Sequence, residues 1–129
     1  MKFYIASSFQ NKDNVQSLKH ILSANGHLST YDWTMNGRAQ TVEQLVRIGT
    51  LEKQAIADCD FFILYLPGGK GSHVELGLAL AFGKKIYLYS KEEILPDEAA
   101  SFYYVDGVEH VFGDIEKLVS AVPGLEETT

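Results

Sequence analysis

The run FFILYL at residues 61–66 narrows the possible folds sharply, because all six positions are apolar. A strand with one face in water alternates apolar and polar residues, whereas a strand covered on both faces is apolar throughout. Pro67-Gly68-Gly69 follows directly and cannot continue a strand. The run therefore predicts a central strand of a parallel sheet with helices on both faces.

Strand-like and helical segments alternate along the rest of the chain. Further short strands are predicted at Phe3–Ser7, His27–Tyr31, Ile86–Tyr89 and Val108–Phe112. Apolar residues recur at helical spacing in 14–24, 41–57, 74–83 and 114–122. Asn25-Gly26 is a typical helix stop, Thr41 and Gln44 have the spacing of a capping box, and Asp114 can cap the last helix. This alternation predicts an α/β, flavodoxin-like (Rossmann-like), doubly wound parallel sheet of about five strands.

Length and composition fit one domain, residues 1–129, with a polar tail at 123–129. The chain has 129 residues, 46% of them hydrophobic, which suits a single core. Its net charge of −6 offers no basic face to a phosphate backbone, so nucleic-acid polymers are not expected partners.

Other sequence features indicate the cellular location and whether a metal site is expected. Cys59 is the only cysteine, which excludes an intrachain disulfide and suits a reducing cytosol. The apolar N-terminal run is too short for a signal peptide or a membrane span, so the expected location is cytoplasmic, without membrane contact. His20, His27 and His110 lack the spacing of a metal site, and no metal is expected.

In open parallel sheets, ligands bind beyond the carboxyl ends of the strands, where the strand order reverses. Three predicted loops lie there, at 6–9, 32–38 and 67–73. The third has glycines at 68, 69 and 71, which let backbone approach a ligand while the next helix presents free N–H groups. It resembles neither a Walker A sequence nor a GxGxxG fingerprint. An oxyanion site and a plain glycine-rich connector are both open readings.

Glu75 is the candidate nucleophile. With a helix beginning at Val74, Glu75 is placed in its first turn, where the helix dipole favours an ionised carboxylate. An ionised carboxylate is what nucleophilic attack requires. Acidic residues also occur there as helix-end stabilisers, so both roles remain open.

The segment GSHVELGLALAFGKKIYL at 71–88 resembles the nucleoside 2-deoxyribosyltransferase superfamily, in which a Glu-aliphatic-Gly motif opens the helix after the third strand. Here that motif is Glu75-Leu76-Gly77, and the 57–60 turn and the FFILYLP strand are also similar to the family. The resemblance implies that Glu75 attacks the anomeric carbon, that the base leaves, and that a second base or water resolves the glycosyl ester.

By the same resemblance, Glu52 stands where the family usually has an aspartate and would orient the substrate and deliver the proton to the leaving group. Tyr4 would position Glu75. For Glu52 the alternative is an exposed helical charge. Deoxynucleotide hydrolases of the superfamily bind a 5′-phosphate with serines and backbone N–H groups. The expected substrate-binding residues are Ser7, Ser8, Phe9, Trp33, Gly69, Gly71, Ser72 and His73.

Several of these positions have competing interpretations. Trp33 could stack on a base or cap the core edge, Arg38 is expected to be solvated rather than bound to a phosphate, and His73 is expected to be an exposed helix-start residue rather than a proton carrier. Gly69 stands where transferases commonly have an aspartate, and Ser72 is not at the family's usual serine position. The difference at Gly69 disfavours base exchange in the strict sense, whereas the difference at Ser72 departs from the serine pattern by which the hydrolases bind a phosphate.

The sequence thus favours cleavage or transfer at an N-glycosidic bond of a small nucleoside or nucleotide, with no cofactor. Two alternatives are a TIR-like NAD glycohydrolase, since TIR-like domains share this architecture and use a glutamate, and a nucleotide-binding module without turnover. The resemblance also implies a homodimer or higher homo-oligomer. Ser101–Tyr104 is the candidate segment for donation to a neighbour, with local packing as the alternative.

Overall fold

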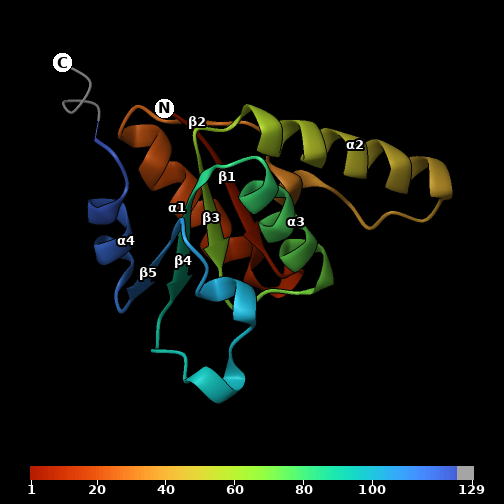
Figure 1. Cartoon of the computed structure of the whole chain (residues 1–129). Coiled ribbons are helices and arrows are strands. Elements are labelled where there is room, and N and C mark those ends of the chain that lie inside the picture. The colour runs from red at the N-terminus through yellow and green to blue at the C-terminus, as the bar shows by residue number, and fades with distance from the viewer. Residues whose placement is uncertain (125–129) are drawn as a thin grey trace.

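The computed structural model describes residues 1–124. At its centre, five parallel strands are paired in the order β2-β1-β3-β4-β5 (Figure 1). The strands are β1 (Lys2–Ser7), β2 (Leu28–Ser29), β3 (Phe61–Tyr65), β4 (Lys85–Ser90) and β5 (Val108–Phe112). This is the flavodoxin-like strand order, in which the winding reverses between β1 and β3. The predicted fold class is confirmed.

Four α-helices among the described residues cover the sheet. They are α1 (Lys12–Ala24), α2 (Val42–Asp58), α3 (Lys70–Ala81) and α4 (Ile115–Ala121). α1 and α4 contact each other on one face, and α2 and α3 contact each other on the opposite face (Figure 1). Among residues 1–124, no helix combines the length and apolar character that crossing a bilayer requires. The two-sided cover explains why β3 is apolar at every position.

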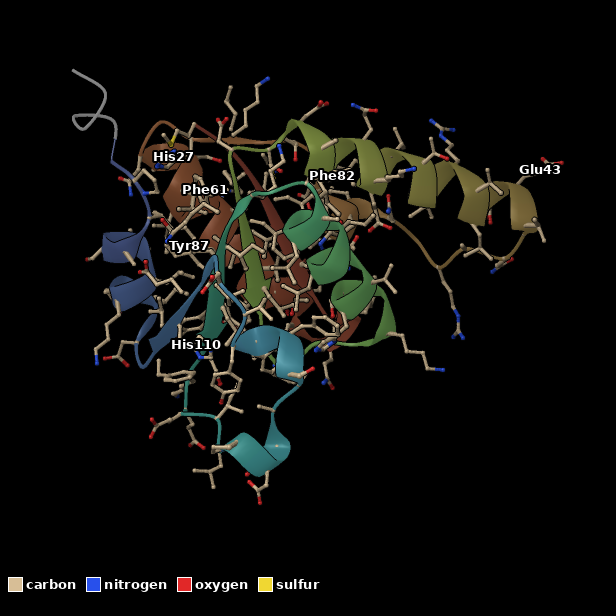
Figure 2. All side chains as sticks on the ribbon, viewed as in Figure 1. His27, Glu43, Phe61, Phe82, Tyr87 and His110 are labelled. Carbon is tan, nitrogen blue, oxygen red and sulfur yellow. The ribbon has the colours of Figure 1, made fainter. Side chains whose placement is uncertain are left out.

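The core lies along β3, as its composition predicts. Phe61, Phe62, Ile63 and Leu64 are each at most 1% exposed. The ring of Phe61 packs edge-on against His27 and Tyr87, with ring centroids 5.4 and 5.9 Å apart (Figure 2). Cys59, just before this strand, is buried at 2% exposure, as expected of a structural thiol.

The second strand is shorter than predicted. The pattern at His27–Tyr31 indicates five residues, but β2 contains only Leu28 and Ser29, because this edge strand pairs only with Lys2 and Phe3 of β1. The connections after strands also contain short 3₁₀ turns, at Phe9–Asn11, Trp33–Met35, Pro96–Glu98 and Ser101–Tyr103. These turns have no periodic apolar pattern from which the sequence could reveal them.

Two helix ends follow their predicted signals, and a third does so only in part. Gly26 takes a φ of 90° just after α1, and the Thr41–Gln44 capping box starts α2. Asp114 occupies the N-cap of α4, but its side chain makes no capping hydrogen bond. The predicted tail at 123–129 lies outside the described residues from 125 onward.

The largest correction concerns the start of α3, which begins at Lys70 rather than Val74. The Gly69 N–H donates to Ser72 Oγ at 2.7 Å, so Ser72 caps the first turn from within the helix. Gly71, Ser72 and His73 are therefore helical rather than part of a loop. Glu75 consequently lies in the second turn, beyond the free N–H groups of the helix terminus.

Candidate active site

Three side chains from three elements meet on the face of the sheet that α2 and α3 cover. Tyr4, on β1, is fully buried, and its hydroxyl lies 2.6 Å from Glu75 Oε2 of α3 and 3.2 Å from Glu52 Oε2 of α2. Because β1 and β3 are neighbours in the sheet, the group lies at the reversal of strand order. These are the three residues to which the sequence resemblance assigns catalytic roles.

The surroundings of Glu75 favour its protonated form. Burial, followed by the charge of Glu52, raises the pKa of Glu75 to about 8, although the hydrogen bond from Tyr4 opposes the shift. Burial also raises the pKa of Glu52. The expectation of a carboxylate kept ionised by a helix terminus is therefore wrong, because Glu75 lies beyond the first turn of α3 in a poorly hydrated position.

The hydrogen count at this site agrees with a protonated carboxyl. Tyr4 has one hydroxyl hydrogen, yet its oxygen lies within hydrogen-bond distance of both carboxyl groups. Burial, then the charges of Glu75 and Glu52, raise the pKa of Tyr4 above its ordinary value, so the phenol keeps its hydrogen. One additional proton, held by the glutamate pair, satisfies both contacts. The pair thus holds one ionised and one neutral carboxyl group near neutral pH.

Glu75 opens onto a cleft of about 470 Å³, large enough for a small metabolite. All predicted substrate-binding residues except His73 line this cleft. Its walls are Ser7, Ser8, Phe9, Trp33, Gly49, Glu52, Lys53, Gly69, Gly71, Ser72, Val74, Glu75 and Leu78. The structure thus brings the loops after β1, β2 and β3 to one place.

A second hollow, of about 530 Å³, adjoins the first and shares Phe9, Trp33 and Glu52 with it. Its other walls are Asn36, Gly37, Arg38, Ala39 and Ile48. Trp33 is 9% exposed, and its indole N–H donates to the Ile5 carbonyl at 2.7 Å. The ring is therefore fixed as a wall between the core and the two hollows, while Arg38 is exposed as expected.

The three serines differ in what their hydroxyl groups can offer a ligand. Ser7 Oγ donates to the Tyr65 carbonyl and accepts from Asn11, and Ser72 Oγ both accepts from and donates to the Gly69 backbone. Ser8 Oγ is buried and has no hydrogen-bond partner within residues 1–124. Ser8 is therefore the serine whose hydroxyl is uncommitted.

His73 is not the exposed helix-start residue that the sequence indicates. Its Nδ1 lies 2.8 Å from the Gly69 carbonyl, and its Nε2 lies 2.7 Å from the Tyr103 hydroxyl. The ring also stacks on Tyr103, which is 6% exposed. Since a carbonyl only accepts, Nδ1 carries a hydrogen, and in the tautomer with its hydrogen there Nε2 accepts from Tyr103. This contact fixes the glycine-rich turn, and nothing in the sequence pairs residues thirty positions apart.

Replacing Tyr103 with phenylalanine should lower the free energy of unfolding by about 1–3 kcal/mol, because His73 Nε2 loses its half-buried donor. Urea unfolding measures this change. The matched control is Tyr104→Phe, since Tyr104 is 56% exposed, and its effect should stay within about 0.5 kcal/mol. Equal effects at both positions would mean that the His73–Tyr103 contact does not hold the turn.

Among the described residues, no three histidine, cysteine, aspartate or glutamate side chains are grouped so that they could hold a metal ion. The titratable groups in the cleft beside Glu75 are Glu52 and Lys53. The cleft thus offers the side chains of Glu75, Glu52 and Lys53, and the phenol of Tyr4 contacts both glutamates.

Solved structures share this architecture, whereas no family model and no curated protein matches the sequence. A 2-deoxyribosyltransferase from Bacillus psychrosaccharolyticus superposes with a TM-score of 0.73 at 17% identity, over 95% of this chain and 93% of that one. A CMP N-glycosidase from Clostridium botulinum gives 0.68 at 23% identity, over 93% and 96%. The chain has the nucleoside 2-deoxyribosyltransferase fold.

A 2-deoxyribosyltransferase from Leishmania mexicana superposes with a TM-score of 0.57 at 19% identity, over 84% of this chain and 76% of that one. The resemblance drawn from the sequence is thereby confirmed for the fold. These neighbours are named as enzymes that act on deoxyribosyl groups or on an N-glycosidic bond of CMP. At such identities the likeness shows the fold alone.

Proposed function

We propose that this chain cleaves or transfers at the N-glycosidic bond of a nucleoside, deoxynucleoside or deoxynucleotide, with Glu75 as the nucleophile. One observation carries the proposal: the buried Tyr4 hydroxyl contacts both Glu75 and Glu52, and these two glutamates line a cleft at the switch point of the sheet. A carboxyl pair that holds one proton supplies an ionised group that can act as nucleophile and a neutral group that can act as acid, which are the two roles in retaining glycosidic chemistry.

In the reactive form, the shared proton lies on Glu52 and Glu75 is ionised. Glu75 attacks the anomeric carbon, the carbon–nitrogen bond breaks, and the base leaves with the Glu52 proton. Tyr4 keeps Glu75 oriented through its 2.6 Å hydrogen bond. Glu52, now ionised, takes a proton from water, whose oxygen attacks the same carbon and frees Glu75. A second base in place of water gives transfer instead of hydrolysis.

The two adjoining hollows suit a substrate with two parts. The sugar would lie by Glu75, and the base would reach the hollow whose shared walls are Phe9 and Trp33. A 5′-phosphate would find the uncommitted Ser8 hydroxyl together with the backbone N–H groups at the start of α3. Ser7 and Ser72 would contribute backbone rather than hydroxyl groups, because their side chains already have partners.

The test is incubation of the purified protein with deoxynucleosides, their 5′-monophosphates, CMP and NAD, each with and without a second base, followed by chromatography. Release of free base from a nucleoside or nucleotide is the expected result, and a new nucleoside in the presence of the second base indicates transfer. Release of nicotinamide alone would support an NAD glycohydrolase. Tight binding without products would contradict the proposal in favour of a binding module.

Replacing Tyr4 with phenylalanine should lower kcat/KM roughly 10- to 100-fold, the expected loss for a hydrogen bond to a charged group. Because that bond lowers the pKa of Glu75, its loss should also shift the acid limb of the pH–rate profile to higher pH. The control is Tyr89→Phe: Tyr89 is 3% exposed and donates to the Gly113 carbonyl at 2.6 Å. This control should lose stability and keep the profile. Identical pH–rate profiles for the wild type, Tyr4→Phe and Tyr89→Phe would contradict the role of Tyr4 in positioning Glu75.

A further inference from the structure

Both arginines of the chain line the same hollow. The sequence contains eleven lysines and arginines, of which only Arg38 and Arg47 are arginine. Arg38 lies in the loop between β2 and α2, and Arg47 lies on α2 itself. This loop leaves the sheet and runs out to the far end of α2 (Figure 1). Between loop and helix lies a hollow of about 420 Å³, here called the arginine hollow, which both side chains line.

The positive charge of the arginine hollow is not neutralised within the described part of the chain. Of the ion pairs within residues 1–124, none includes Arg38 or Arg47, and no carboxyl group lines the hollow. Glu43, four positions before Arg47 on α2, is exposed and is not part of its wall. In a chain of net charge −6, two guanidinium groups in one concavity make a local positive field that attracts an anion.

The two amide side chains in this hollow also offer hydrogen-bond donors. Gln44 Oε1 accepts from the N–H groups of Gln40 and Thr41, at 2.7 and 3.3 Å. Because a backbone N–H only donates, these bonds fix the amide and leave its NH₂ group without a partner among the described residues. The Tyr31 hydroxyl donates to Asn36 Oδ1 at 3.0 Å, so the NH₂ group of Asn36 is left in the same way. Both amides therefore present donors to a ligand.

Guanidinium and amide donors without a carboxyl group suit an oxyanion. The oxygens of a carboxylate accept several hydrogen bonds, and those of a phosphate accept more. The planar fork of an arginine can give two parallel N–H groups to two such oxygens. A cationic ligand, by contrast, would meet two like charges here. The lining thus selects a carboxylate or a phosphate group.

The position of the arginine hollow indicates which part of a substrate would carry that group. The hollow of about 530 Å³ that adjoins the cleft, here called the base hollow, shares residues 36–39 and Ile48 with the arginine hollow. The arginine hollow shares no lining residue with the cleft beside Glu75. A 5′-phosphate near Ser8 would lie in that cleft, on the other side of the base hollow. An anion beside the arginines is therefore attached to the base rather than to the sugar.

We propose that Arg38 and Arg47 bind an oxyanion carried by the leaving base, at the edge of the base remote from the glycosidic nitrogen. The substrate is then a nucleoside or nucleotide whose base bears a carboxylate or phosphate group, either directly or on a short arm. The inference rests on the proposed function, which puts the sugar beside Glu75 and the base in the base hollow. Anion recognition by the arginines can nevertheless be measured without turnover, because the free base has no glycosidic bond.

Calorimetric titration with free bases tests the site. The ligands are 5-carboxyuracil and N6-succinyladenine, which carry the carboxylate on the ring and on an arm, each compared with its carboxamide. The wild type should bind at least one of them roughly 10- to 100-fold more tightly than its carboxamide, as charge-assisted hydrogen bonds predict. Equal affinities within both pairs would overturn the inference. Inorganic phosphate that binds as tightly as the carboxylated bases would show that the anion is separate from the leaving base, which would also overturn it.

Substitution of the arginines tests whether they cause the preference. Arg38→Gln and Arg47→Gln should each reduce the carboxylate-to-carboxamide preference roughly 3- to 10-fold, and the double variant should abolish it. Arginine-to-lysine variants should keep part of it, because lysine keeps the charge and lacks the fork. The matched control is Lys117→Gln, since Lys117 is exposed on α4, on the opposite face of the sheet. An equal loss in this control would overturn the inference, because net charge would then set the preference.

Turnover of nucleosides separates this inference from the proposed function. The kcat/KM for 5-carboxy-2′-deoxyuridine or N6-succinyl-2′-deoxyadenosine should exceed that for its carboxamide, mainly through a lower KM. Cleavage of neutral deoxynucleosides without any gain from a carboxylate would overturn the inference and leave the proposed function intact. Arginine-dependent binding of the carboxylated bases without cleavage of any nucleoside would support the oxyanion site and contradict the proposed function.

Discussion

Glu75→Gln should lower kcat/KM for base release by roughly 10⁴-fold or more, the usual consequence of removing a nucleophile. Glutamine keeps the shape of the side chain and can still bond Tyr4, so the cleft should remain formed. The variant lacks the carboxylate whose oxygen would form the glycosyl ester. The variant should therefore bind nucleotide without releasing base, which equilibrium binding and chromatography together measure.

The control for Glu75→Gln is the same substitution at an acidic residue outside the cleft. Glu116 is exposed on α4, on the face of the sheet opposite α3, and Glu116→Gln should retain full activity. Turnover by Glu75→Gln at the wild-type rate would exclude covalent catalysis by this carboxyl group. Loss of activity in both variants would point to an unspecific effect of removing charge.

Glu75→Gln should also stabilise the protein at alkaline pH, by on the order of 3 kcal/mol relative to the wild type. The pKa of Glu75 is about 8 in the folded chain and 4.5 in an ordinary carboxyl group. The folded state therefore binds this proton more tightly than the unfolded state. The associated stability is fully present below about pH 4.5 and is lost as the pH rises through 8.

Glutamine has no such proton to lose, so the difference between the two proteins should widen between about pH 5 and pH 9. Urea unfolding at several pH values within that range measures it. Burial also raises the pKa of Glu52, so this group lowers the free energy of unfolding of both proteins as the pH rises. Because the two carboxyl groups interact, part of the pH dependence of the wild type belongs to Glu52. A constant difference across the range would show that Glu75 is ionised in the folded chain.

The sequence predicts the sheet well because its signals are local. The all-apolar run at 61–66 gives the central strand, and the Thr41–Gln44 spacing gives the start of α2. The start of α3 could not be found in the same way. Glycines at 68, 69 and 71 are typical of a loop, whereas Ser72 caps the helix by bonding back to Gly69, a contact that composition does not reveal.

The candidate site, too, is only partly predictable from the sequence. The meeting of Tyr4, Glu52 and Glu75 was expected from family resemblance, since these residues lie on separate elements that only the folded sheet brings together. The protonation of Glu75 was not predictable, because it depends on burial and on the distance to a second carboxyl group. The His73–Tyr103 contact was missed for a related reason: its partners lie in segments without periodicity.

Because Cys59 is buried, the reactivity of its thiol can report on the stability of the fold. This thiol is the only one in the sequence, it is 2% exposed, and burial raises its pKa to about 11. An alkylating reagent needs both access and a thiolate, so labelling should proceed only through transient opening of the chain. One mass measurement over time would then report how often the sheet opens in each variant, without denaturant and without an engineered label.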